Sequence, residues 1–233
     1  MLLLPTRLQW GALLALLLPF VFAYTVGPSG NMLPLLLGLF CAGVFVALSP
    51  HGALRRGSAW ALLALPVLLY LHSLLAAPAT PSLLLGTALA LLVFALVAQS
   101  TAGWLQQGQA AWLWGLVLLA AVLNSVIAVL QYQGWAAPFS PWLHPGNALR
   151  PFGNLRQPNQ LATLCSMGYA IVLVYAPGIA PRWRSPQALW TGAVLLLLAL
   201  ACALSRSRTG LLQWVLVWGA VLGWAALGRG KQA

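Results

Sequence analysis

The sequence predicts an all-α polytopic membrane protein with about eight transmembrane helices. Of its 233 residues, 62% are hydrophobic and only 5% are charged, whereas about 25% of the residues of a soluble domain are charged. Apolar runs of about 20 residues, the length that a membrane helix needs, recur along the chain. Because so little polar surface cannot cover a soluble core, the composition excludes a soluble enzyme, a secreted disulfide scaffold and a disordered segment.

Eight apolar runs predict the individual helices, with boundaries good to a few residues. They cover residues 8–26, 31–49, 59–77, 82–100, 111–131, 159–177, 188–204 and 209–227. The first run is too long for a cleavable signal peptide, and no small-x-small site follows it cleanly, so we interpret it as a span. The chain then divides into a five-span bundle (1–131), one long loop (132–158) and three further spans (159–233).

The basic residues predict that both termini lie in the cytoplasm. With this orientation the inside segments hold seven of the 11 Lys and Arg residues, in accord with the excess of positive charge expected there. The outside segments hold four, and these lie in only two places, the 132–158 loop and the Ser205–Gly210 turn. Arginines that oppose the topology rule need another reason to be there, so we expect a functional site at these two places.

The sequence contains no Asp and no Glu. It therefore has no carboxylate pair for glycoside hydrolysis, no carboxylate ligands for Mg²⁺, Mn²⁺ or Ca²⁺, and no membrane proton relay through carboxylates. We expect no metal site and no cofactor. The net charge of +11 would suggest nucleic acid in a soluble protein, but here the basic residues are scattered between apolar runs. We expect the phosphates of membrane lipids as their partners, and not nucleic acid.

The second half of the long loop reads RPFGNLRQPNQLATL, from Arg150 to Leu164. Its glycine and prolines predict a compact backbone, and Pro158 suits the first turn of the next helix, where a missing N–H costs nothing. Amide side chains are costly near lipid unless they form hydrogen bonds. We therefore expect the following residues to shape the loop or to bind sugar: Gly153, Asn154, Gln157, Pro158 and Asn159.

The second place reads SRSRTG, from Ser205 to Gly210, and Ser207 or Thr209 can cap the last helix. Two helix amino ends and four guanidiniums can thus converge on one outer cleft, which suits a diphosphate. The simpler alternative is that the arginines only extend to lipid head groups. Asn159, likewise, would then be no more than a helix cap.

Two further candidates lie in the long loop. His144 is the only histidine placed there to act as a base, although the prolines and the glycine around it favour a turn. Arg156 is the second arginine of the loop.

These two segments resemble the bacterial protein O-oligosaccharyltransferases, the pilin glycosylation ligases, which are relatives of the O-antigen ligases and polymerases. The resemblance rests on Gly153-Asn154-Leu155, Gln157-Pro158-Asn159 and Leu161-Ala162-Thr163, and then on the SRSRTG turn. It covers about 15 and 6 residues. The first segment is fairly specific to the protein-glycosylating branch, whereas the second is common to the wider superfamily.

The resemblance implies a metal-independent enzyme of the bacterial inner membrane. Such enzymes take a glycan from undecaprenyl pyrophosphate in the periplasm and pass it to a Ser or Thr of a pilin-like protein, or to lipid A core. By position, Arg150 corresponds to the first arginine patch that holds the pyrophosphate, and Arg206 and Arg208 to the second. Arg156 falls where the resemblance places no required arginine.

Members of this family continue for several more spans, with a periplasmic loop whose histidine is thought to activate the acceptor. Here the chain stops shortly after Gly228, and no histidine follows His144. We therefore expect the amino-terminal, donor-binding half of such an enzyme, with a separate carboxyl-terminal half as a candidate partner. The alternatives are a catalytically incomplete fragment or scaffold that binds polyprenyl lipid, and a transporter or flippase. Against the last, the sequence shows no inverted repeat and no charged midplane site.

Overall fold

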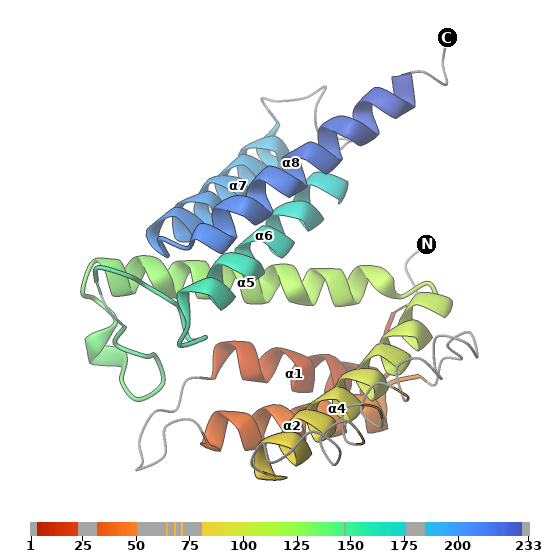
Figure 1. Ribbon diagram of the computed structural model, residues 1–233. Coiled ribbons are helices and arrows are strands. Elements are labelled where there is room, and N and C mark those ends of the chain that lie inside the picture. Colours follow the sequence, from red (N-terminus) through yellow and green to blue (C-terminus); the bar gives the residue numbers. More distant parts are fainter. Residues whose placement is uncertain are drawn as a thin grey trace. The chain divides into compact units, whose positions relative to one another are not determined.

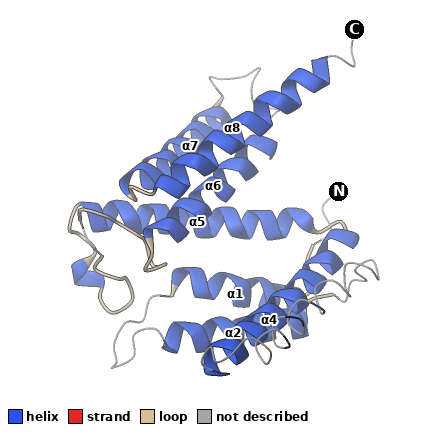
Figure 2. Ribbon diagram, viewed as in Figure 1, coloured by secondary structure: helices blue, strands red, loops and turns tan. Residues whose placement is uncertain are grey.

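The computed structural model describes residues 4–22, 32–50, 64, 68, 71, 81–146, 148–175 and 185–229. Within these residues the fold is entirely helical, without strands (Figures 1 and 2). The helices are α1 (Arg7–Val21), α2 (Met32–Leu48), α4 (Pro81–Gln106), α5 (Ala110–Tyr132), the 3-10 helix η1 (Ala137–Phe139), α6 (Pro158–Tyr175), α7 (Pro186–Leu204) and α8 (Arg208–Arg229).

Seven of the eight predicted apolar runs are confirmed as helices, and the third run, 59–77, lies outside the described residues apart from three single positions. Two boundaries were wrong. The first helix ends at Val21, before the predicted residue 26, and α4 continues to Gln106, beyond the predicted residue 100. The extension of α4 includes Thr101, whose hydroxyl bonds back to the Val97 carbonyl at 2.8 Å.

Among the described residues, three helices are long and apolar enough to cross a membrane. They are the Leu89–Gln106 part of α4, α5 and α7. The apolar helices α1 and Leu36–Leu48 of α2 are shorter. Together with the composition, these helices support a membrane protein, while the number of eight spans and the cytoplasmic termini stay predictions.

The chain folds into two compact units, which we describe separately. The first comprises Met1–Pro19 and Asn31–Leu113. Its polar contacts join the start of α1 to the turn after α4: the Gln9 Nε2 donates to Gln107 Oε1 at 3.1 Å and to Gln109 Oε1 at 2.9 Å. Trp104 is fully buried, and its indole N–H donates to the Ser49 hydroxyl at 3.0 Å. These bonds satisfy polar groups that would otherwise be buried without partners.

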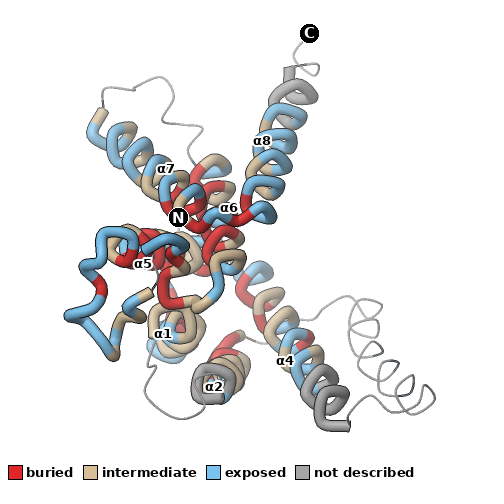
Figure 3. Tube along the Cα trace, turned by 60° about the vertical axis from the view of Figure 1, so that its left-hand side comes forward, coloured by how far each residue is buried: buried red, intermediate tan, exposed pale blue. Residues whose placement is uncertain are grey.

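The second unit comprises Phe20–Gly30 and Trp114–Ala233, and α6 is its central helix. Two glycines allow close helix packing. A Cβ on Gly168 would lie 2.8 Å from the Ala121 Cβ of α5, and a Cβ on Gly210 of α8 would lie 2.6 Å from the Ala162 Cβ of α6. α7 and α8 both pack along α6 and then diverge from each other (Figure 3). The candidate site lies in this second unit.

Candidate functional site

The long loop is fixed by a buried glutamine at the end of α5. Gln131 is 1% exposed. Its Nε2 donates to the carbonyls of His144 (2.9 Å) and Gly153 (2.7 Å). Its Oε1 accepts from the backbone N–H groups of Phe152 (3.0 Å) and Gly153 (2.9 Å). Both donors and the acceptor oxygen of this side chain are thus bonded to the loop backbone, which holds the loop against the helix.

Two asparagines complete this buried amide cluster. Asn124 lies two helical turns before Gln131 on α5 and is fully buried, and its Oδ1 accepts the Asn154 N–H at 2.9 Å. The Asn154 side chain accepts the His144 N–H at 3.1 Å and donates to the Val21 and Trp142 carbonyls. Asn154 is 4% exposed. The structure therefore places its amide inside the loop, where it shapes the backbone.

Gly153 is required at its position for two reasons. Its φ is +65°, in the left-handed region that favours glycine. A Cβ there would also lie 2.6 Å from the Asn124 Oδ1. Three residues further on, Arg156 adopts a φ of +60°, an uncommon conformation for a residue with a side chain.

The loop and the SRSRTG turn, far apart in sequence, meet through two hydrogen bonds. The Arg150 Nε donates to the Ser205 carbonyl at 3.3 Å. The Ser207 hydroxyl donates to the Asn159 Oδ1 at 2.8 Å and accepts the Gly210 N–H at 3.1 Å. Ser207 is therefore the residue that caps α8, one of the two caps that the sequence predicts.

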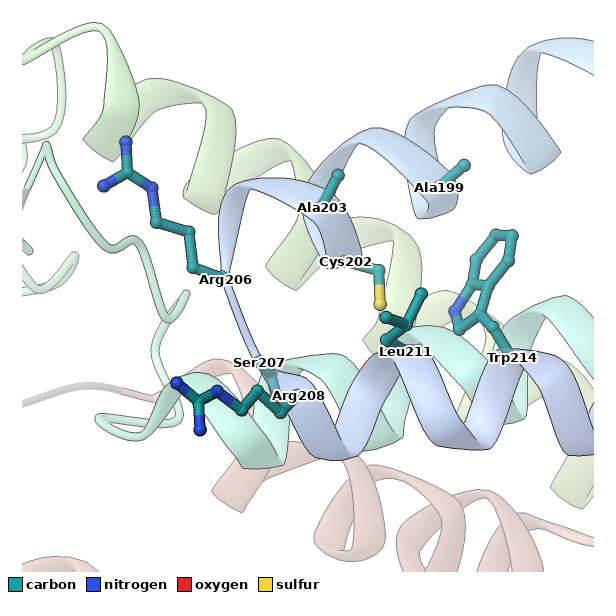
Figure 4. Close-up of a pocket in the computed structure, with 8 residues that line it drawn as sticks. All are labelled: Ala199, Cys202, Ala203, Arg206, Ser207, Arg208, Leu211 and Trp214. Atoms are coloured by element: carbon teal, nitrogen blue, oxygen red, sulfur yellow. The ribbon is translucent and has the colours of Figure 1, made fainter.

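A cleft of about 500 Å³ lies at this junction. Its lining is basic and polar, and it comprises Arg150, Asn159, Arg206, Arg208 and Thr209. The three arginines are exposed. Figure 4 shows the side chains of Arg206 and Arg208 extending from the turn, away from the bodies of α7 and α8. The structure thus brings together the three arginines that the sequence singles out at these two segments.

The turn that presents Arg206 is itself constrained. Arg206 has a φ of +51°, a left-handed conformation that costs about 1–2 kcal/mol for a non-glycine residue. Ser205, fully buried, donates to the Cys202 carbonyl at 2.6 Å and accepts the Ser207 N–H at 3.3 Å. The two serines fix the backbone on both sides of Arg206, so the guanidinium is presented from a defined turn.

The other predicted site residues do not line this cleft. Pro158 begins α6, as expected, and Gln157 beside it is exposed. Arg156 is half-buried and acts electrostatically on His144. Burial, and to a lesser extent Arg156, lower the pKa of His144 below its usual value of 6.5.

The His144 side chain is engaged within the loop. Its Nδ1 accepts the Gly146 N–H at 2.9 Å, and its ring packs edge-on against Phe152 with 4.8 Å between the ring centroids. A neutral imidazole that accepts at Nδ1 carries its proton on Nε2. In this arrangement neither ring nitrogen has a free lone pair, so His144 is not poised to take a proton from a substrate hydroxyl.

Asn124 and Gln131 are the residues that sequence reasoning missed. Both lie inside the apolar run 111–131, which we interpreted only as a span. A usable signal was present: the two amides are seven residues apart, and so lie two turns apart on one helix face. Polar groups inside an apolar span are expensive and usually have assigned partners.

Residues 151–175 match the family of protein glycosylation ligases. The matched segment begins directly after Arg150 and contains the end of the loop, with Gly153 and Asn154, and the whole of α6, with Asn159. No curated protein and no solved structure matches the chain. The match covers a short segment, and with the apolar helices it supports a membrane glycosylation ligase in general terms.

Proposed function

We propose that this chain is the donor-binding half of a membrane glycosyltransferase of the bacterial inner membrane. It would move an oligosaccharide from undecaprenyl pyrophosphate to a protein Ser or Thr, or to lipid A core, in the periplasm. The observation that carries the proposal is the cleft in which Arg150 of the loop meets Arg206 and Arg208 of the turn. The match of residues 151–175 to the glycosylation ligases supports it independently of that geometry.

In this proposal the three guanidiniums bind the diphosphate of the donor. Their planar, forked N–H groups match phosphate oxygens. The amino end of α8, which begins at Arg208, adds backbone N–H groups and a positive dipole end. When the bond between sugar and phosphate breaks, negative charge increases on the departing diphosphate, and positive groups already in place stabilise it.

The loop residues have a supporting role in this scheme. The amide cluster of Asn124, Gln131 and Asn154 fixes the loop that carries Arg150. Gln157, which is exposed beside the start of α6, is our candidate for a contact with the sugar. Asn159 belongs to the cleft itself and is oriented by its bond from Ser207.

The proposal is tested by replacing Arg150, Arg206 and Arg208 singly with Ala and measuring glycan transfer, together with the carboxyl-terminal half, in a strain that lacks its own ligase. We expect each variant to lose at least about tenfold of the transfer activity, since charge-assisted hydrogen bonds contribute about 1.5–3 kcal/mol each. Arg7→Ala, at an exposed arginine of the other unit, is the matched control. Unchanged transfer by all three variants at normal protein levels would reject the assignment.

A second candidate function is binding of the lipid-linked donor without transfer. The lining of the cleft consists of arginines and neutral polar groups, and an acceptor hydroxyl must lose a proton to a base during transfer. Binding needs no base, whereas transfer needs one from a partner polypeptide or from elsewhere. The two functions are distinguished by adding a carboxyl-terminal half to purified chain that binds the donor. Gain of transfer would support the donor-binding half of a transferase, and continued binding without transfer would support binding alone.

A further inference from the structure

The part of the long loop that precedes Arg150 exposes a set of large aromatic and apolar side chains. Each of them is between 45% and 69% exposed, and they are Tyr132, Trp135, Phe139, Trp142 and Leu149. Tyr132 is the last residue of α5, and the other four lie outside every helix that is long enough to cross a membrane. We call these five residues the loop patch.

Hydrogen bonds fix the backbone that carries the loop patch. The Trp135 N–H donates to the Leu130 carbonyl of α5 at 2.8 Å. The Trp142 carbonyl accepts from the buried Asn154 side chain at 3.3 Å. Because the backbone is held while the rings stay exposed, the rings do not withdraw into a core of this chain. A contiguous apolar surface of this kind is typical of a contact with a membrane or with another protein.

The place of the loop patch along the chain favours a membrane. α5 is long and apolar enough to cross a bilayer and ends at Tyr132. The loop begins at the same end of this helix (Figure 1), so the patch lies where the span leaves the hydrocarbon. Trp and Tyr are enriched at that level in membrane proteins, because their rings are apolar and their N–H and O–H groups reach water.

The charges around the loop patch also favour lipid as its cover. No Lys or Arg lies between Arg56 and Arg150, and the chain has no Asp or Glu. The patch therefore has no acidic or basic side chain of its own, which suits insertion between lipids. Arg150 follows Leu149 directly and is exposed, and a basic residue at this point matches the phosphates of lipid head groups.

We infer that the loop patch inserts into the head-group region of the bilayer, on the face of the membrane where α5 ends, and anchors the long loop there. In the predicted topology this face is the periplasmic one. Arg150 lines the cleft of the three arginines, so the anchor also sets the depth of that cleft relative to the lipid phosphates. The inference goes beyond the proposed function and does not depend on it, because the partner is the lipid surface itself.

The test measures the depth of nitroxide spin labels on the full chain in liposomes of phosphatidylethanolamine and phosphatidylglycerol. Trp135→Cys and Phe139→Cys carry labels in the loop patch. Leu196→Cys, at a residue of α7 that is 71% exposed, serves as the reference for hydrocarbon, and Gln157→Cys, at an exposed polar residue, as the reference for water. The native cysteines are buried, and the wild-type chain measures their background labelling.

Depth is obtained from the collisions of each label with oxygen, which enters lipid, and with a water-soluble nickel complex. We expect both patch labels to lie about 5–10 Å within the interface, deeper than the label at Gln157 and shallower than the label at Leu196. Patch labels as accessible to nickel as the label at Gln157 would overturn the inference. Patch labels shielded from both reagents would also overturn it, because they would show a protein cover.

A second measurement tests whether the patch anchors the rest of the loop. A label at Leu149→Cys, next to Arg150, is followed while Trp135 and Phe139 are both replaced by Ser. We expect this label to move towards water. Phe94→Ser, at an aromatic residue of α4 that is 62% exposed, is the matched control and should leave the label in place. An unchanged depth in the double variant would show that these rings do not anchor the loop.

Discussion

At the scale of single residues, Gly153 is a position at which the loop tolerates a side chain poorly. Gly153→Ala combines a left-handed backbone with a Cβ 2.6 Å from the Asn124 Oδ1. We expect it to lower the free energy of unfolding by about 2–5 kcal/mol. The measurement is thermal or denaturant unfolding of the purified protein in detergent.

Gly134→Ala is the matched control for this prediction. Gly134 also has a positive φ, of +76°, but open space surrounds the position of its Cβ. Only the backbone strain remains, which costs about 1–2 kcal/mol. Equal losses in the two variants would show that the contact between Gly153 and Asn124 has no energetic weight.

His144 gives the loop a predicted pH dependence. Burial and Arg156 lower the pKa of this histidine in the folded protein below its usual 6.5. As the pH falls below about 6.5, the unfolded chain therefore binds a proton that the folded chain refuses, and stability decreases until the pH reaches the lowered value. Above pH 6.5 both states are neutral and this effect disappears.

His144→Asn tests this pH dependence. An asparagine keeps an acceptor for the Gly146 N–H but does not titrate. We expect the wild-type protein to lose stability between pH 7 and pH 5 relative to this variant, in unfolding curves recorded across that range. Parallel pH profiles for the two proteins would show that His144 is not held neutral by the loop.

The residues of the site differ in how well the sequence predicts them. The sequence singles out Arg150, Arg206 and Arg208 because the predicted topology places them outside, against the expected charge bias, and in the structure all three line one cleft. Asn124 and Gln131 were not predicted, although their spacing of seven residues was a usable signal, and the backbone groups that they bind are visible only in the structure. The positive φ of Arg206 has no signal in the sequence, because it arises from the bonds around Ser205.

At the scale of helices, the packing of α8 against α6 depends on Gly210. A Cβ at this position would lie 2.6 Å from the Ala162 Cβ and 3.1 Å from the Cys202 Sγ. We expect Gly210→Ala to lower the free energy of unfolding by about 1–3 kcal/mol through overpacking. It should also weaken donor binding, because it moves the helix end that carries Ser207 and Arg208. Unfolding and binding measurements on the same preparation check both effects.

Gly219→Ala, further along the same helix, should raise the free energy of unfolding. No atom lies within 4 Å of a Cβ at this position. Replacing glycine by alanine inside a helix stabilises it by about 0.5–1 kcal/mol. A loss of stability in this variant, or none in Gly210→Ala, would contradict the packing described for α8.

The positions of the helices were largely predictable, and their ends were less so. Apolar runs identify the helices because lipid requires long apolar segments with internally bonded backbones. The end of α4 was placed too early, since the polar residues around Gln106 suggested a break. The helix in fact ends at the turn around Gly108, whose φ is +68°. Polarity alone does not end a helix where its backbone bonds can continue.

At the scale of the whole molecule, the absence of carboxylates sets the character of the site. The chain contains no Asp or Glu and carries a net charge of +11. An anionic ligand therefore meets no acidic side chain of this chain. The sequence predicted that the loop and the turn meet, from charge bias and helix direction. The close approach itself depends on the contacts of Ser205, Ser207 and Asn159, which no periodicity in the sequence reveals.

The central claim is that arginines from two distant segments hold one diphosphate. A double-mutant cycle of Arg150→Ala and Arg206→Ala, read out as affinity for undecaprenyl diphosphate, tests it most directly. We predict that each single variant loses at least about tenfold in affinity, and that the two losses are coupled by about 0.5–3 kcal/mol because both side chains bind the same ligand. Unchanged affinity in the single variants, or losses that simply add, would contradict a shared diphosphate site.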